Sequence, residues 1–346
     1  MDETPNISDR YLRQTRFPPF GVEGQRRLSE ARMLVCGCGA LGSVVADLLV
    51  RAGVGFVRIV DRDFVELDNL HRQVLFTEQD AAEQLPKAIA AERRLAEVNS
   101  QVEIDAVVAD VNAGNIRHLA AKMDVLVDGT DNFETRYLLN DLAVEQNLPW
   151  VFAGCVGAEG QTMAILPGDT PCLSCILPEP PPASSQPTCE TAGVLGPLVG
   201  VIASLQAMEA VKLGSGNAAA VSRHLTVLDL WNNQLRSINM AASRRPDCTT
   251  CGERKFPWLT GERGASVTSL CGRNSVQISP TTGEAVNLDV LAERLGSLGQ
   301  VSRNPYLVRI AVGEFLLTVF ADGRTIVGGT DDPAVARTVH AKYVGN

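Results

Sequence analysis

A G-x-G-x-x-G motif constrains this chain more than any other feature of its sequence. Gly37, Gly39 and Gly42 follow the short apolar run at residues 32–36 and open a helix-length segment. Glycine at such a strand-to-helix junction lets backbone N–H groups approach a phosphate at a helix N-terminus. Asp61 closes the next predicted strand, where a carboxylate can bind ribose hydroxyls. The two signals together predict a nucleotide site. The alternative is that the glycines bind no ligand and serve only the close packing of a helix against a strand.

The sequence around this motif alternates short strands with helices. This alternation is typical of a parallel sheet covered by helices, so we predict an α/β fold with a doubly wound, mostly parallel, Rossmann-like sheet. The predicted strands are residues 32–36, 56–60, 102–108, 125–128 and 150–153, then 161–166, 225–230 and 234–238. The predicted helices are residues 41–51, 87–98, 133–146 and about 197–213.

The last part of the chain has strand, helix and hairpin signals of its own. Asp322 and Gly323 lie between two predicted strands, as in a tight hairpin. We therefore predict two domains, a large one over residues 1–255 and a small α/β domain over residues 256–346. The sequence of the small domain does not indicate its role.

Charge and hydropathy argue against two classes of protein. The net charge of -9 argues against a general nucleic-acid binder, which needs a basic surface to neutralise phosphates. Charged residues interrupt the apolar stretches before the roughly 20 residues that a membrane span requires. The N-terminus has no apolar signal core. We therefore expect a cytoplasmic protein without nucleic-acid or membrane partners.

The residues after Asp61 distinguish ATP from a nicotinamide cofactor. Arg72 and Lys87 put two cations near the ligand-binding edge of the sheet. A dinucleotide pyrophosphate, held mainly by backbone amides, needs these cations less than an ATP triphosphate that loses pyrophosphate. Asp131, in the run at residues 128–132, is placed to hold Mg2+ or its waters. Singly, the cations could be surface ion pairs and Asp131 a helix cap. A nicotinamide-dependent oxidoreductase remains the rival class.

Four cysteines form two C-x-x-C pairs, which favours a metal site. Four thiolates suit a closed tetrahedral Zn2+ that joins two distant segments and stabilises the fold. A redox pair is the alternative. The expected ligands are Cys172, Cys175, Cys248 and Cys251. Four further cysteines are interpreted as small buried hydrophobic residues: Cys36, Cys38, Cys155 and Cys271.

These motifs, in this order, resemble the ThiF/MoeB/HesA branch of the ubiquitin-activating-enzyme superfamily. The resemblance covers about residues 10–252. It rests on the run at residues 10–14, the glycine motif, Asp61, residues 69–73, Lys87, the run at residues 128–132 and both cysteine pairs.

The resemblance implies an adenylyltransferase, a nucleotidyltransferase that converts ATP to AMP and pyrophosphate. Its substrate would be the C-terminal glycine carboxylate of a ubiquitin-like sulfur carrier that ends in Gly-Gly, and a cysteine desulfurase is a possible sulfur donor. Activation of a ubiquitin-like modifier or peptide for conjugation is the alternative, and a catalytically inactive scaffold is another. The nucleotide-binding residues expected from motif and resemblance are Gly37, Gly39, Ala40, Gly42, Asp61, Asp63, Asn69, Arg72, Gln73, Lys87, Asp131 and Asn132.

The catalytic residues implied are Arg13, Arg72, Lys87, Asp131 and Cys189. Arg13 would reach the site of a neighbouring subunit, which implies a homodimer. Cys189 matches the reactive-cysteine position of the family, where it would accept the activated acyl group or form a disulfide with the carrier's thiocarboxylate. Related enzymes can carry a rhodanese domain, but the sequence around Cys271 departs from that pattern, so we do not expect one here.

Overall fold

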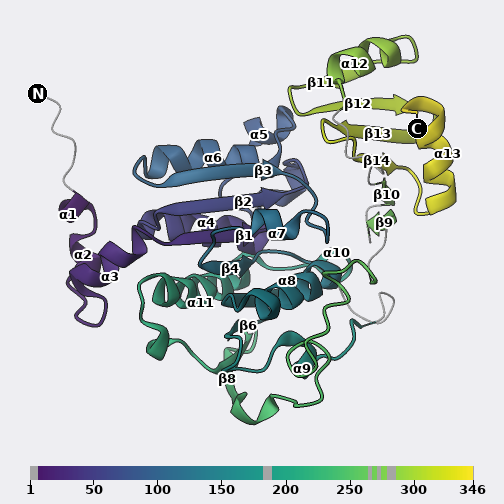
Figure 1. Ribbon diagram of the computed structural model, residues 1–346. Helices are drawn as coiled ribbons and strands as arrows, with labels where there is room; N and C mark the ends of the chain where they lie inside the picture. The colour runs from purple at the N-terminus through teal and green to yellow at the C-terminus, as the bar shows by residue number, and fades with distance from the viewer. Residues whose placement is uncertain (1–6, 182–188, 264–266, 271–273, 279–285, 346) are drawn as a thin grey trace, which may run out of the picture. The chain divides into compact units, whose positions relative to one another are not determined.

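The computed structural model in Figure 1 describes residues 7–181, 189–263, 267–270, 274–278 and 286–345. Contacts divide the chain into two compact units. The first comprises residues 1–82 and 86–263, and the second residues 83–85 and 264–346. The division falls after Arg263 rather than near Phe256, because Phe256 and Trp258 pack against the core of the first unit.

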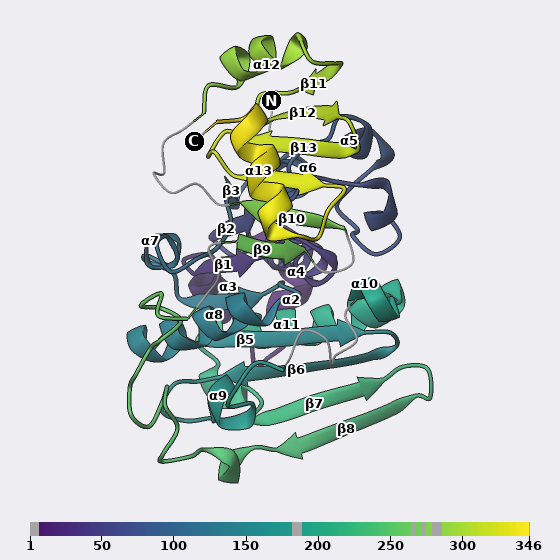
Figure 2. The same ribbon diagram turned by 90° about the vertical axis from the view of Figure 1, so that its right-hand side faces the viewer.

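The first unit is built on an eight-stranded sheet with strand order β3-β2-β1-β4-β5-β6-β7-β8. In this spatial order, the neighbouring strands from β3 through β2, β1 and β4 to β5 pair in parallel, and those from β5 to β8 pair antiparallel. Figure 2 shows the antiparallel half, β5 to β8. This confirms the predicted α/β fold class. The strands are β1 Arg32–Cys36, β2 Phe56–Asp61, β3 Glu103–Val108, β4 Val125–Asp128, β5 Trp150–Val156, β6 Glu159–Ile165, β7 His224–Asp229 and β8 Gln234–Asn239.

Helices cover both faces of this sheet, which explains why its central strands are buried and apolar. Side chains alternate between the faces: Met33 and Val35 lie near α11 and α4, whereas Leu34 and Cys36 belong to the core beneath α7 and α8. The long helices are α4 Ala40–Ala52, α6 Lys87–Val98, α8 Phe133–Gln146 and α11 Gly196–Gly214. Shorter ones are α1 Ile7–Arg10, α2 Leu12–Thr15, α3 Gly21–Leu28, η1 Leu67–Asn69, α5 Glu78–Ala82, α7 Ile116–Leu119, α9 Leu173–Ile176, α10 Cys189–Ala192, η2 Ala218–Ala220 and η3 Ala241–Ser243.

Helix α11 is the one described helix that could cross a membrane by length and composition alone. In this fold it packs against α4 and against β4, β5 and β6. A Cβ on Gly160 of β6 would lie 2.5 Å from Ile202 of α11, so the helix and the strand approach closely. Its apolar residues therefore include a face that belongs to the core.

The second unit has a six-stranded antiparallel sheet with strand order β11-β12-β13-β14-β10-β9. Two helices pack on this sheet around a core that includes Leu291, Leu317 and Val339. The hairpin predicted at Gly323 joins β13 to β14. The elements are β9 Val267–Leu270, β10 Ser275–Ile278, α12 Leu288–Gly296, β11 Val301–Arg303, β12 Leu307–Val312, β13 Phe315–Phe320, β14 Thr325–Gly328 and α13 Pro333–Tyr343.

Candidate functional site

The glycine loop, residues 37–42, connects β1 to the start of α4. Gly37 has a φ of +86°, and a Cβ there would lie 2.7 Å from the carbonyl oxygen of Gly129. A Cβ on Gly42 would lie 1.8 Å from the carbonyl oxygen of Gly37. Only glycine fits these two positions, and the loop brings the backbone to the N-terminus of α4, where N–H groups can bind an anion.

Asp61 ties the end of β2 to the glycine loop. Its Oδ2 accepts a hydrogen bond from the backbone N–H of Cys38 at 2.6 Å, and its Oδ1 accepts one from the N–H of Asp63 at 2.7 Å. Burial raises the pKa of Asp61, while Lys87 and the two N–H donors act in the opposite direction. The carboxylate is thus held rigidly beside the glycine loop.

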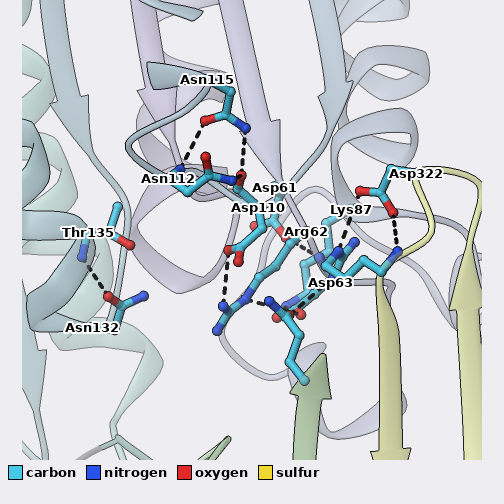
Figure 3. A network of polar contacts seen from close by, with 12 residues as sticks. Asp61, Arg62, Asp63, Lys87, Asp110, Asn112, Asn115, Asn132, Thr135 and Asp322 are labelled. Atoms are coloured by element: carbon cyan, nitrogen blue, oxygen red, sulfur yellow. Dashed lines mark hydrogen bonds and ion pairs between the residues drawn. The ribbon is translucent and has the colours of Figure 1, made fainter. Parts of the chain in front are cut away.

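Lys87 lies next to this carboxylate pair, at the start of α6. Its Nζ is 3.4 Å from Oδ2 of Asp63, and its backbone N–H donates to the carbonyl oxygen of Asp63 at 2.9 Å. Figure 3 shows the side chains of Asp61, Asp63 and Lys87 gathered at one place. Lys87, 24 residues further along the chain than Asp63, therefore shares one site with Asp61 and Asp63. This site lies beside the ion pair of Arg62 with Asp110 at 3.1 Å.

The turn at residues 69–73 adds amide and guanidinium groups. Asn69 is buried, and its carbonyl oxygen accepts the backbone N–H of Gln73 at 3.0 Å. Nη1 of Arg72 donates to the carbonyl oxygen of Asp68 at 2.8 Å. The side-chain Oε1 of Gln73 is buried and has no hydrogen-bond partner among the residues that the structure describes. The Gln73 amide lies close to Gly39, so a polar ligand could satisfy this oxygen.

A turn after β4, residues 128–132, carries Asp131 and is called the Asp131 turn below. The cap of α8 is Asn132, whose Oδ1 accepts the N–H of Thr135 at 2.8 Å. Asp131 is exposed and is not the cap. Gly129 donates its N–H to the carbonyl oxygen of Cys36 at 2.7 Å, so this turn lies directly against the glycine loop.

Arg13 lies far from the glycine loop of its own chain. Its neighbour Gln14 donates to the carbonyl oxygen of Ala52, at the C-terminal end of α4, at 3.0 Å. The glycine loop is at the other end of this 13-residue helix, which is about 20 Å long at 1.5 Å per residue. Arg13 is exposed on α2 and is not brought together with Lys87 or Asp131.

The segment that carries Cys189 returns to the nucleotide end of the sheet. Cys189 begins α10, which lies near β5, but its side chain is outside the described part, as is Cys271. Further along, a Cβ on Gly196 would lie 2.8 Å from the carbonyl oxygen of His71, next to Arg72. The start of α11 therefore contacts the turn at residues 69–73.

The two C-x-x-C pairs meet in one cluster. Sγ of Cys172 lies 3.9 Å from that of Cys175 and 3.6 Å from that of Cys248, and the Cys175 and Cys251 sulfurs are 3.3 Å apart. Tetrahedral zinc with Zn–S bonds of about 2.3 Å requires sulfurs about 3.8 Å apart. Burial and the neighbouring thiols raise the pKa of Cys172, so a cation is needed to keep this thiol ionised. The donor set fits Zn2+.

Helix α8 supports this cysteine cluster. Oδ1 of Asn140 accepts the N–H of Leu173 at 2.8 Å, within the first pair. Oδ1 of Asp141 accepts from Oγ1 of Thr250 at 3.1 Å, within the second pair. The hydroxyl groups of Ser174 and Thr250 are 3.0 Å apart and connect the two segments.

Arg136 of α8 was not among the predicted site residues. Its guanidinium is buried and bonds to the Asp131 turn. The sequence does carry a pattern that includes Arg136. Asn132, Arg136 and Asn140 are spaced four residues apart, so they form a polar stripe on a helix whose neighbouring residues are mostly apolar. An arginine in such a stripe is more often exposed, so the spacing alone did not indicate its role.

The fold and these contacts define an α/β protein with a glycine loop suited to a nucleotide and a four-cysteine cluster suited to a metal ion. The ThiF family matches residues 11–250. A relative from Bacillus subtilis (strain 168), "Sulfur carrier protein ThiS adenylyltransferase", is 42% identical and aligns over 98% of this chain and 100% of its own length. The chain belongs to the ThiF family.

Further relatives match a smaller share of the chain. "Sulfur carrier protein adenylyltransferase" of Thermus thermophilus is 41% identical over 73% of this chain and 94% of its own. "Adenylyltransferase and sulfurtransferase MOCS3-1" of Zea mays is 40% identical over 70% of this chain, which spans about half (52%) of that relative. Among solved structures, E. coli MccB with ATP has a TM-score of 0.61 and 25% identity, over 70% of this chain and 74% of that one.

Proposed function

We propose that this protein is a nucleotidyltransferase that uses ATP to adenylate the C-terminal glycine carboxylate of a ubiquitin-like sulfur carrier. The observation that carries the proposal is the likeness to the Bacillus ThiS adenylyltransferase over 98% of this chain and the full length of that relative. The geometry supports it, because the glycine loop, Asp61 and Lys87 form one site.

The reaction needs electrostatic stabilisation more than proton transfer. An oxygen of the carrier's carboxylate, already ionised at neutral pH, attacks the α-phosphate, and pyrophosphate leaves. Charge develops on the phosphates, where Lys87 and Arg72 would stabilise it. Asp61 would bind the ribose, and the N–H groups at the start of α4 would bind a phosphate.

Two metals have separate roles in this proposal. Asp131, exposed at the rim of the glycine loop, would hold Mg2+ or its waters between the phosphates. Asn132, the next residue, caps α8 and would thereby position Asp131. Zn2+ at the cysteine cluster would stabilise the fold without taking part in the reaction, because all four protein ligands close the site.

The protein is proposed to act as a homodimer in which Arg13 completes the partner's site. Arg13 is separated from its own glycine loop by the length of α4, so it cannot serve that site. Helix α11 also presents Val201, Leu205 and Met208, with exposed fractions of 40%, 37% and 55%. An apolar helix face of this kind is typical of a surface that a partner subunit covers.

Later steps would follow adenylation in the cytoplasm. Cys189 would accept the activated acyl group from the acyl-adenylate, with AMP as the leaving group, and a cysteine desulfurase would supply the sulfur. The start of α11, which follows this segment, contacts the turn that holds Arg72, which supports a position near the reaction. We propose that the last part of the chain, which the sequence predicts from residue 256 and whose compact unit resumes at Gly264, is a separate domain.

One alternative has its own support. The solved structures include "Microcin C7 biosynthetic enzyme MccB in complex with N-formylated MccA", at 25% identity and a TM-score of 0.62. Activation of a modifier or peptide for conjugation therefore stays the second candidate, within the same adenylation chemistry.

The test is ATP–pyrophosphate exchange with the purified chain, Mg2+ and a panel of Gly-Gly-ended carriers from the same organism. We expect exchange with one carrier and none with the same carrier lacking its last glycine. Exchange with none of the carriers, but with another substrate bearing a free C-terminus, would support the alternative.

A further inference from the structure

Arg136 is a buried arginine on the first turns of α8, beneath the nucleotide end of the sheet. Only 8% of its surface is exposed. Its guanidinium carbon lies 5.3 Å from the ring centres of both Phe133 and Phe152. A Cβ on Gly154 would lie 3.3 Å from Nη2, so glycine at 154 leaves room for the guanidinium. A charge buried this deeply needs specific partners.

Those partners lie in the Asp131 turn and on β5. Nε donates to Oδ2 of Asp128 at 3.3 Å, and Nη2 donates to the carbonyl oxygens of Thr130 at 2.8 Å and Ala153 at 3.1 Å. The other oxygen of Asp128 accepts from the N–H and Oγ1 of Thr130 at 2.9 and 2.7 Å. Arg136 and Asp128 therefore hold Thr130 from both sides.

Thr130 is the residue before Asp131, and the turn has little freedom to move. Gly129 donates its N–H to Cys36, and a Cβ on it would lie 2.3 Å from the carbonyl oxygen of Gly37. Gln206 of α11 also donates to the carbonyl oxygen of Asp128 at 2.7 Å. The backbone of the Asp131 turn is therefore held by Arg136 on one side and by the glycine loop on the other, while the Asp131 carboxylate stays exposed.

We propose that Arg136 is a positioning residue, which holds the Thr130 carbonyl and Asp128 so that Asp131 meets the magnesium ion of Mg2+·ATP. This inference rests on the proposed function, which gives Asp131 its role. Lysine cannot replace Arg136, because the contacts require a planar fork of donors and a lysine has one charged nitrogen.

The test is the affinity of the full-length chain for ATP, measured by calorimetry with and without Mg2+ and without any carrier. We expect Arg136→Lys to weaken Mg2+·ATP binding about tenfold, as for loss of a charge-assisted hydrogen bond, and to change binding of Mg2+-free ATP much less. A purely structural role would lower the melting temperature and weaken both equally, which would overturn the proposal.

Asp131→Ala provides the decisive comparison. If Arg136 acts through Asp131, then Arg136→Lys should weaken Mg2+·ATP binding little further in a chain that already carries Asp131→Ala. Additive losses of Mg2+·ATP affinity would overturn the inference. Should Arg136→Lys not fold, Thr130→Val decides instead. It removes one hydrogen bond to Asp128 and should show a smaller loss that is again confined to Mg2+·ATP; an unchanged affinity would count against the proposal.

The outcomes separate this inference from the proposed function. A chain that binds Mg2+·ATP but exchanges with no carrier would contradict the function and leave this binding test valid. If Asp131→Ala left the Mg2+ dependence unchanged, the role of Asp131 would be wrong and the inference would fall with it. If Asp131→Ala altered that dependence and Arg136→Lys did not, the inference alone would be wrong.

Discussion

Lys87 is the residue whose charge the proposed reaction depends on most directly. Its ammonium faces Asp63 at 3.4 Å, beside Asp61. We expect Lys87→Ala to reduce ATP–pyrophosphate exchange by about 100-fold or more, because the charge that develops on the phosphates loses a positioned cation. The matched control is Arg93→Ala, an exposed cation on the same helix, which should retain exchange. Equal activities of the two variants would mean that Lys87 is only an ion-pair partner.

Asp141 is expected to make stability depend on pH. Burial raises the pKa of this carboxyl to about 6, although hydrogen bonds from Trp258 and Thr250 act against the shift. The unfolded value is near 4, so between these two values the folded state holds more protons than the unfolded state. The free energy of unfolding therefore falls as pH rises from about 4 to 6, by about 1–3 kcal/mol.

Asp141→Asn tests this dependence. An amide can accept from the N–H of Trp258 and donate to Oγ1 of Thr250, and it does not titrate. Denaturant unfolding of both chains at several pH values, with equal zinc content verified, should show the wild type losing stability relative to the variant as pH rises. Parallel curves would mean that Asp141 titrates as it does in the unfolded chain.

At the scale of elements, the cysteine cluster connects segments that no continuous element joins. The first pair lies at α9 and the second follows β8, and both are bonded to α8. Removal of the metal should leave four neighbouring thiols and lower the free energy of unfolding by about 4 kcal/mol or more, since metal binding contributes to folding.

Cys172→Ser should reproduce the effect of a chelator. We expect loss of bound zinc and a lower melting temperature, measured by metal analysis and thermal unfolding. Cys155→Ser is the matched control, because Cys155 is buried outside the cluster and should retain its zinc. A stable, zinc-free Cys172→Ser chain would show that the metal is not a structural requirement.

The sequence predicted the elements of the first unit well for physical reasons. Strands buried on both faces read as apolar runs, and the helix at residues 87–98 has the predicted bounds. The glycine loop was predictable because only glycine tolerates its contacts. The role of Arg136 was not predictable, since a lone arginine in a helix usually lies at the surface. Its burial depends on Phe152 and Asp128, which only the tertiary fold brings near.

At the scale of the whole molecule, the sequence left the placement of Arg13 undetermined. The length of α4 separates this arginine from the glycine loop of its own chain. The dimer proposal therefore predicts complementation. Arg13→Ala and Lys87→Ala should each be inactive as pure proteins, for different reasons. The Arg13→Ala subunit gives no arginine to its partner's site, whereas the Lys87→Ala subunit lacks the lysine of its own site.

In a mixed dimer of these two variants, one site has both defects and the other has none. That intact site takes Lys87 from the Arg13→Ala subunit and Arg13 from the Lys87→Ala subunit. Random pairing of equal amounts makes half of the dimers mixed, so co-expression should restore about a quarter of wild-type exchange. The control pairs Arg13→Ala with the Arg13→Ala/Lys87→Ala double variant, which offers no arginine and should restore nothing. An inactive mixture of proven mixed dimers would place Arg13 outside the reaction, because a residue that acts in the partner's site must be complemented.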